Sequence, residues 1–183
     1  MENKLGITGI DNKALIAALQ DALAEEINAW YAYEIVAPFL TGNNHLEIEE
    51  LFREHAKDEL EDHAYWLMDR INKLGGAPMG ILSPSNLNRV ATHKYITPTA
   101  PFNVITIIDQ NIKAEEGAIE TYVKLEKLTR DKDVVTNLKM KEILADEQEH
   151  LQALLEWKDA CQNGKKVSFK KTGGVFNYLN YIR

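Results

Sequence analysis

The chain has 183 residues, of which 45% are hydrophobic and 27% are charged, and its formal net charge at pH 7 is −7. A chain of this length is typical of one domain with its own core, so we expect a single domain over residues 1–183. Only five prolines and ten glycines occur, which favours helices. The negative charge argues against DNA binding, because nucleic-acid-binding surfaces carry an excess of Lys and Arg.

Cysteine content and hydropathy indicate the compartment. Cys161 has no partner for an intrachain disulfide, and the first residues lack the basic and then apolar pattern of a signal peptide. The longest apolar stretch, residues 29–40, is interrupted by Glu34 and Pro38 and is too short to cross a bilayer. The sequence therefore predicts a cytoplasmic protein without a membrane segment.

Four segments carry apolar residues at alternating steps of three and four, the period of a helix with one buried face. The first two segments are separated by residues 41–44 and the last two by residues 130–133. Linkers this short join antiparallel helices. The sequence therefore predicts an all-α bundle over about residues 11–162, made of two helical hairpins.

Residues 75–101 differ from the rest of the chain, because they contain four of its five prolines and show no sustained period. A connection of this length can run back along the whole bundle. We therefore expect one long crossover between the two hairpins. After residue 162, the segment 172–183 has apolar residues at helical spacing and is expected to form a short fifth helix on a neighbouring subunit, with a frayed terminus as the alternative.

Ionisable residues interrupt the apolar faces of all four predicted helices. Each hairpin has one Glu on its first helix and a Glu followed by a His on its second helix. These residues are Glu26, Glu59 and His63 in the first hairpin and Glu115, Glu147 and His150 in the second. Buried carboxylates need compensation, carboxylates can bridge two cations, and imidazoles add nitrogen ligands that suit iron, manganese or zinc. The pattern therefore predicts a dinuclear metal centre in the core.

Three segments carry a resemblance to a known family: residues 26–33 (EINAWYAY), 58–64 (DELEDHA) and 142–150 (EILADEQEH). Together they resemble bacterioferritins and the Dps-like mini-ferritins of the ferritin-like superfamily. The resemblance implies two iron ions per subunit, held by the six Glu and His residues, and a ferroxidase that oxidises Fe(II) with dioxygen or hydrogen peroxide. It also implies iron storage in a hollow homo-oligomer, on the order of 12 or 24 subunits.

Two other functions stay open at this point. One is a rubrerythrin-like peroxidase or another di-iron oxidoreductase without mineral storage, and the other is a non-catalytic bundle with structural carboxylates. Glu61 occupies the position at which bacterioferritins have the haem-binding Met, so we expect no haem. The cysteines of the rubrerythrin electron-transfer module are absent, since Cys161 is the sole cysteine.

The spacing of Glu59 departs from the family. Three residues separate it from His63, where the family has two, and Leu60 occupies the usual ligand position. Either Leu60 has replaced the ligand, or one extra residue moves Glu59 into place. An extra residue is commonly absorbed as a π-type turn. We expect this second arrangement, with a locally widened helix between Glu59 and His63.

Other polar residues are expected to support the ligands. Tyr33 and Tyr122 are either core aromatics or hydrogen-bond donors to bridging carboxylates. We expect Asp146 to accept a hydrogen bond from His63, and Asp58 from the corresponding His150.

Two further positions carry expectations of their own. For His55 a surface or supporting role is expected, with an extra ligand as the alternative. Gly117, inside a helix, suggests a close contact with another helix.

Overall fold

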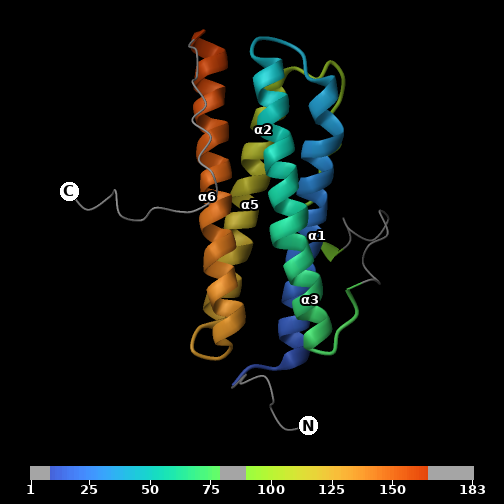
Figure 1. Cartoon of the computed structure of the whole chain (residues 1–183), viewed down its shortest axis with the longest axis vertical. Coiled ribbons are helices and arrows are strands. Elements are labelled where there is room, and N and C mark those ends of the chain that lie inside the picture. The colour runs from blue at the N-terminus through green and yellow to red at the C-terminus, as the bar shows by residue number, and fades with distance from the viewer. Residues whose placement is uncertain (1–8, 79–89, 165–183) are drawn as a thin grey trace, which may run out of the picture.

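The computed structural model describes residues 9–78 and 90–164 (Figure 1). Its elements are α1 (Asn12–Val36), the 3₁₀ turn η1 (Ala37–Phe39), α2 (His45–Lys57), the π-helical segment η2 (Asp58–Ala64), α3 (Tyr65–Lys73), α5 (Val104–Thr129) and α6 (Val134–Asn163). Helix α1 is antiparallel to the continuous rod formed by α2, η2 and α3, and α5 is antiparallel to α6 (Figure 1). The predicted all-α four-helix bundle is confirmed. The predicted fifth helix at 172–183 lies outside the described residues.

Polar side chains define where the helices begin. Asp11 accepts hydrogen bonds from the backbone N–H groups of Lys13 and Ala14 at the start of α1. Asn103 does the same for Ile105 at the start of α5. Each such cap satisfies a backbone donor that the helix leaves free and contributes about 1 kcal/mol.

None of the helices in the described part of the chain combines the length and the apolar character that a membrane span requires.

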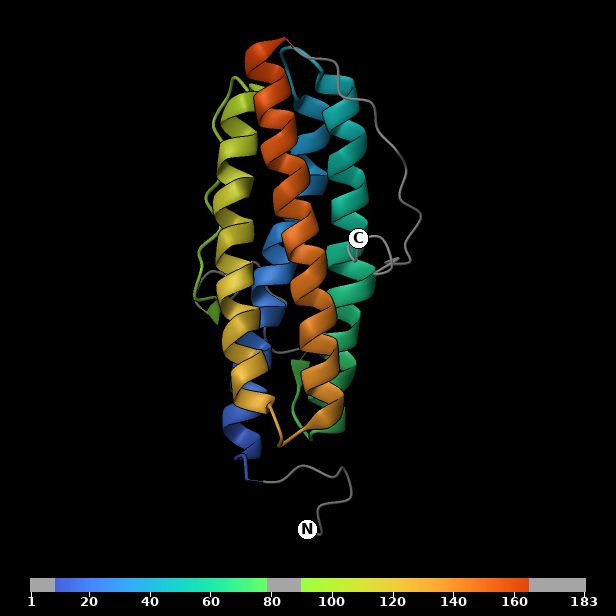
Figure 2. The same cartoon turned by 90° about the vertical axis from the view of Figure 1, so that its left-hand side faces the viewer.

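The crossover returns the chain to the end of the bundle at which α1 stops. There Thr41 donates its backbone N–H to Phe102 at 2.8 Å and accepts from Val104 at 3.0 Å. Farther back, the backbone N–H of Thr92 donates to the Asp21 carboxylate at 2.6 Å. The described part of the crossover, residues 90–103, thus lies against the outside of the bundle (Figure 2).

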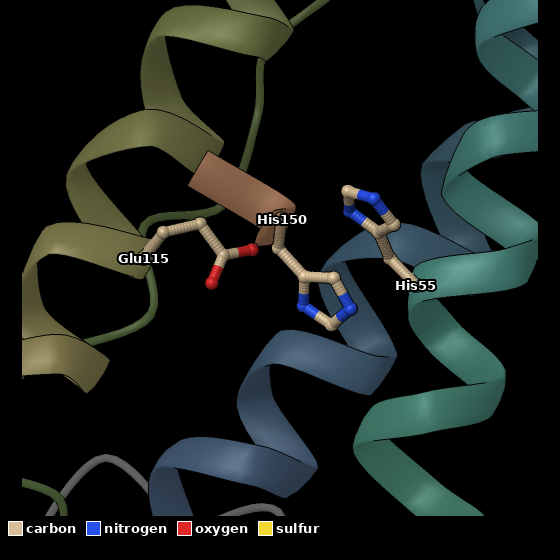
Figure 3. A group of neighbouring side chains, drawn as sticks. All are labelled: His55, Glu115 and His150. Atoms are coloured by element: carbon tan, nitrogen blue, oxygen red, sulfur yellow. The ribbon is translucent and has the colours of Figure 1, made fainter. Parts of the chain in front are cut away.

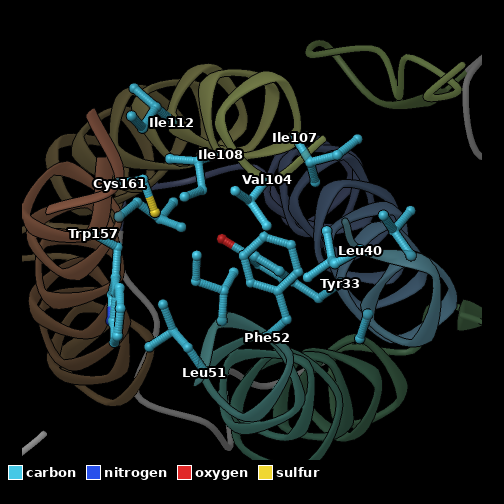
Figure 4. Close-up of a cluster of buried hydrophobic side chains, with 14 of the residues drawn as sticks. Tyr33, Leu40, Leu51, Phe52, Val104, Ile107, Ile108, Ile112, Trp157 and Cys161 are labelled. Atoms are coloured by element: carbon cyan, nitrogen blue, oxygen red, sulfur yellow. The ribbon is translucent and has the colours of Figure 1, made fainter. Parts of the chain in front are cut away.

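Two apolar clusters fill the ends of the bundle. In the cluster near the end of α1, the rings of Tyr33 and Phe52 meet edge to face with centroids 5.0 Å apart. Figure 4 shows side chains from the surrounding helices pointing inward around these two rings. The second cluster contains Leu19, Leu67 and Tyr122 and fills the opposite end. Each large apolar side chain that is fully buried contributes about 1.5–3 kcal/mol, so the clusters hold the helices on both sides of the polar middle section.

The second helical rod widens where the sequence predicts it. Residues Asp58–Ala64 form the π-helical segment η2, and the backbone N–H of Tyr65 donates to the carbonyl of Leu60, five residues earlier. Glu59 and His63 both lie in this segment and are buried, whereas Leu60 is only partly buried. The expectation of one extra residue absorbed by a π-type turn is confirmed.

A buried ion pair connects the two hairpins at the end opposite to Thr41. The guanidinium of Arg70 donates to the Asp133 carboxylate at 2.6 Å and to the Thr136 hydroxyl at 2.8 Å. Asp133 also caps α6 by accepting the backbone N–H of Thr136 at 3.1 Å. Because Arg70 is 5% exposed and Asp133 is 1% exposed, neither charge has water as an alternative partner.

We predict that Asp133→Ala lowers the free energy of unfolding by about 3–5 kcal/mol, since it leaves the Arg70 charge buried without its partner. Asp133→Asn keeps an acceptor for the helix cap and removes only the charge, so it should cost less. Denaturant unfolding of both variants at one protein concentration measures the difference. A loss below about 1 kcal/mol for Asp133→Ala would contradict a role of this pair in stability.

Candidate metal centre

Six ionisable side chains lie in the section between the two apolar clusters. They are Glu26 on α1, Glu59 and His63 on η2, Glu115 on α5, and Glu147 and His150 on α6. None of the six is more than 5% exposed. The structure thus brings together all the residues that the sequence marks as candidate ligands.

The donor atoms of these six residues form two overlapping groups of four. In the first group, Glu26, Glu59, His63 and Glu147 each offer one atom, and these atoms lie within 4.8 Å of one another. The second group consists of Glu59, Glu115, Glu147 and His150, and its donor atoms also lie within 4.8 Å of one another. Glu59 and Glu147 thus occur in both groups. Glu59 and Glu147 are therefore placed to bridge two positions.

Short contacts surround the ring nitrogens that face the centre. The Nδ1 atom of His63 lies 3.2 Å from Glu26, 3.0 Å from Glu59 and 3.2 Å from Glu147. The Nδ1 atom of His150 lies 3.2 Å from Glu59 and 3.7 Å from Glu147. The Nδ1 atoms are thus the nitrogens that point at the bridging carboxylates.

Several of these atoms lack a hydrogen bond of good geometry. They are one carboxylate oxygen of Glu59, both carboxylate oxygens of Glu147 and the Nδ1 atom of His150. Unpaired buried acceptors are costly and uncommon in folded proteins. Here they converge on the same space, and oxygen donors with one imidazole per position suit iron, manganese or zinc. The residues present therefore fit two metal ions.

Tyrosine hydroxyls cross from each hairpin to the carboxylate of the other. Tyr33 on α1 donates to Glu115, and Tyr122 on α5 donates to Glu26. Both tyrosines are buried, and their contacts explain why the sequence repeats a Tyr seven residues after each Glu. The donation of both hydroxyls to carboxylates of the centre supports the role as hydrogen-bond donors that the sequence suggests. Which carboxylates bridge two ions stays a prediction. The tyrosines thus hold Glu115 and Glu26 in place.

Aspartates face the outer nitrogens of the two imidazoles. The Nε2 atom of His63 forms a hydrogen bond with Asp146 at 3.4 Å, and the Nε2 atom of His150 lies 3.5 Å from Asp58. Both pairs join different hairpins, as expected from the sequence. An acceptor at Nε2 keeps a proton there and leaves Nδ1 free to bind a cation.

Charge in the centre separates the carboxylates into two classes. Burial, and then the negative charges of Glu147 and Glu59, raise the pKa of Glu26 and of Glu115 well above the usual range. These two carboxyl groups therefore favour the protonated form when no cation is present.

The bridging carboxylates behave in the opposite way. Burial raises the pKa of Glu59 and Glu147, but contacts with His150 and His63 outweigh it, and both pKa values are lowered. Burial lowers the pKa of the two imidazoles, but their contacts with surrounding carboxylates outweigh it and raise both values. Protons on the imidazoles thus compensate the two ionised carboxylates.

A cavity of about 230 Å³ leads to the centre from the crossover side. Glu26, Glu115, Ala29, Ala118 and Ile96 are among its lining residues. Most of the lining surface is apolar, so a small molecule can approach the carboxylates of the centre through this cavity.

The crossover residue His93 closes one side of this cavity. Its Nδ1 atom and its backbone N–H both contact the buried Glu25 carboxylate at 2.9 Å. A Cβ atom on Gly117 would lie 2.7 Å from Cγ of His93. The close contact expected at Gly117 therefore exists, but its partner is the His93 ring and not another helix. The sequence places His93 only in a loop and gives no signal for this contact.

His55 is buried, which contradicts a surface role and leaves the supporting role and the extra ligand. It is 5% exposed and stacks on the ring of His150, with centroids 4.0 Å apart and ring planes at 21°. Burial, and then the neighbouring charge of His150, lower the pKa of His55 well below its usual value. The ring is therefore neutral, with a lone pair on one nitrogen.

Comparison with known proteins agrees with this geometry. Residues 16–162 match the ferritin-like domain. The chain belongs to the ferritin-like family. The resemblance noted from the sequence is thus confirmed, and no curated protein sequence matches.

Solved structures show the same relationship. The bacterioferritin-related protein of Bacteroides fragilis, described as a dodecameric thioferritin, shares 35% identity with a TM-score of 0.80, covering 85% of this chain and 90% of that one. Ferritin-like di-iron carboxylate proteins of Bacillus anthracis share 24% identity with a TM-score of 0.68 over 82% of this chain and 99% of theirs. The Dps protein of Vibrio cholerae O1 shares 18% identity with a TM-score of 0.72 over 85% of this chain and 99% of that one. The last two structures show the fold alone.

We predict that Tyr122→Phe weakens metal binding to this ferritin-like protein by about 10-fold or more, because Glu26 loses the donor that orients it. Tyr31→Phe is a matched control, since that Tyr is exposed on α1. Calorimetric titration with Co(II) measures both affinities. Equal affinities for wild type and Tyr122→Phe would contradict an orienting role.

We also predict that metal binding releases protons, with about two displaced by each ion. Glu26, Glu115, His63 and His150 have raised pKa values, so they hold protons in the metal-free centre that a cation must replace. The apparent affinity should consequently rise with pH. Calorimetry in two buffers of different ionisation enthalpy counts the protons, and a heat that is independent of the buffer would refute this charge assignment.

Proposed function

We propose that this ferritin-like protein is a ferroxidase that binds two Fe(II) ions per subunit and oxidises them with dioxygen or hydrogen peroxide. The observation that carries the proposal is that Glu59 and Glu147 belong to both donor groups. Shared carboxylates hold two cations a few ångströms apart, about 3.5–4 Å in dinuclear sites. The proposed ligands are Glu26, Glu59, His63 and Glu147 for one ion and Glu59, Glu115, Glu147 and His150 for the other.

The donor set favours the direction of the reaction. Carboxylate oxygens are hard anionic donors, which stabilise Fe(III) more than Fe(II). Two Fe(II) ions supply the two electrons that reduce dioxygen, with two protons, to hydrogen peroxide. The same two electrons and two protons convert one hydrogen peroxide to two waters. Since all the proposed ligands are buried, they need little rearrangement when charge develops.

Storage of the ferric product requires assembly, which we propose as a hollow homo-oligomer in the cytoplasm. Phe39 and Leu46 are exposed near the α1–α2 turn, and Val134 and Leu138 are exposed near the turn between α5 and α6. Apolar side chains exposed at both ends are typical of surfaces that meet other subunits. The bacterioferritin-related protein of Bacteroides fragilis is described as dodecameric, which favours 12 subunits over 24.

A second candidate is a di-iron peroxidase or oxidoreductase without storage, and the cavity favours it. A cavity of about 230 Å³ whose lining includes Glu26 and Glu115 has room for a small organic substrate. Light scattering combined with iron loading separates the two functions. A cage that retains many ferric ions per subunit supports storage, whereas a small oligomer that retains at most two supports the oxidoreductase.

We predict that Glu59→Ala abolishes binding of the second Fe(II) and reduces the oxidation rate, because this side chain serves both positions. Glu61→Ala is the matched control, since Glu61 lies in the same π segment and is exposed. Anaerobic Fe(II) titration gives the stoichiometry, and rapid mixing with air or peroxide gives the rate. Unaltered two-iron stoichiometry and rate in Glu59→Ala would show that Glu59 is not a ligand.

A further inference from the structure

His55 brings a seventh donor to the centre. It lies on α2, one turn before Glu59, and its Nδ1 atom is buried without a hydrogen-bond partner. The ring of Tyr33 packs edge-on against it, with centroids 5.2 Å apart. A buried nitrogen that has lost water and gained no partner is uncommon in a folded protein, so its lone pair is available to another group.

The nearest donors are two residues of the proposed centre. One atom each of His55, Glu115 and His150 lie within 4.8 Å of one another. Figure 3 shows the three side chains converging from α2, α5 and α6, with both rings on the same side of the carboxylate. Ligands around one tetrahedral ion are about 3.4 Å apart for bonds near 2.1 Å. Each imidazole binds along its own ring plane, so the two stacked rings must rotate apart from their 21° arrangement to place one ion among the three.

We propose that His55, Glu115 and His150 form an alternative position for a divalent transition-metal ion. The proposal rests on the proposed function, because two of its three residues are ligands of the second ion there. The Nδ1 atom of His150 binds one ion at a time, so the new position and the position at the bridging carboxylates exclude each other. The second ion can therefore occupy either of two positions, and His55 does not create a site for a third ion.

The two places differ in chemistry. The bridging position surrounds an ion with three carboxylates and one imidazole, whereas the His55 position offers one carboxylate and two imidazoles. A set of two His and one carboxylate suits Fe(II) and, among other divalent ions, Co(II) and Zn(II), and it leaves coordination sites open. The more anionic bridging set suits an ion of higher charge. The His55 position is therefore selective for the divalent state.

Packing alone is the competing explanation, since the His55 ring also supports His150 by stacking. His55→Phe separates the two roles, because it keeps a ring for stacking and removes both nitrogens. His45→Ala is the control: His45 begins the same helix and is exposed. The metal-free protein is titrated with Co(II), which reports nitrogen ligation through its visible absorption, and with Zn(II) by calorimetry.

We expect His55→Phe to weaken the binding of the second ion by about 10-fold or more and to alter its Co(II) spectrum, with His45→Ala unchanged. Unchanged affinity and spectrum in His55→Phe would assign His55 to packing and overturn the proposal. Failure of wild type to bind two ions would overturn the proposed function as well. The two failures are thus distinguishable.

A measurement on wild type avoids any effect of the substitution on folding. Crystals of the full chain equilibrated with Zn(II) give anomalous diffraction at the zinc edge. A peak between His55, Glu115 and His150 supports the proposal. Zinc found only at the positions that include Glu59 and Glu147 rejects it.

Discussion

The buried negative charge of Glu26, Glu59, Glu115 and Glu147 is the constraint on which the rest of this structure depends. Four ionised carboxylates in one core would each cost several kcal/mol if left uncompensated. Two imidazoles and protons on Glu26 and Glu115 offset the charge in the metal-free protein. Two divalent cations with neutral imidazoles, as in the proposed function, would offset it equally well. The same side chains could therefore balance the charge with protons or with cations.

This exchange requires that the ligands stay in place while their partners change. Tyr33 and Tyr122 hold carboxylates of the opposite hairpin by hydrogen bonds that do not involve the space between the ligands. Asp146 holds His63 in the same way from the opposite hairpin. These contacts stabilise the two hairpins against each other in the polar section, where apolar packing is interrupted. The apolar clusters close this section towards both ends of the bundle.

Much of the fold and of the candidate centre could be predicted because both depend on the spacing of apolar and ionisable residues along the chain. The four amphipathic segments, the short turns and the proline-rich crossover are all visible as spacing. Glu26 and Glu115 are conspicuous because charge on an apolar face needs an explanation. His55 and His93 are different. The burial of His55 depends on how the two hairpins pack, and the contact of His93 with Gly117 depends on the path of a long loop. Neither feature produces a periodic pattern in the sequence.

The π segment explains how the departure from the family spacing can be tolerated. In a regular α-helix one extra residue rotates everything after it by about 100°, because each residue contributes that angle. Leu67 and Ile71 would then leave the core. The widened turn absorbs the extra residue within Asp58–Ala64, so Leu67 and Ile71 stay fully buried and Glu59 stays beside His63. A search for the Glu-x-x-His spacing alone overlooks Glu59. The repeated Asp-Glu pair on the two second helices identifies it, because the pair is set by the contacts each residue makes across the bundle.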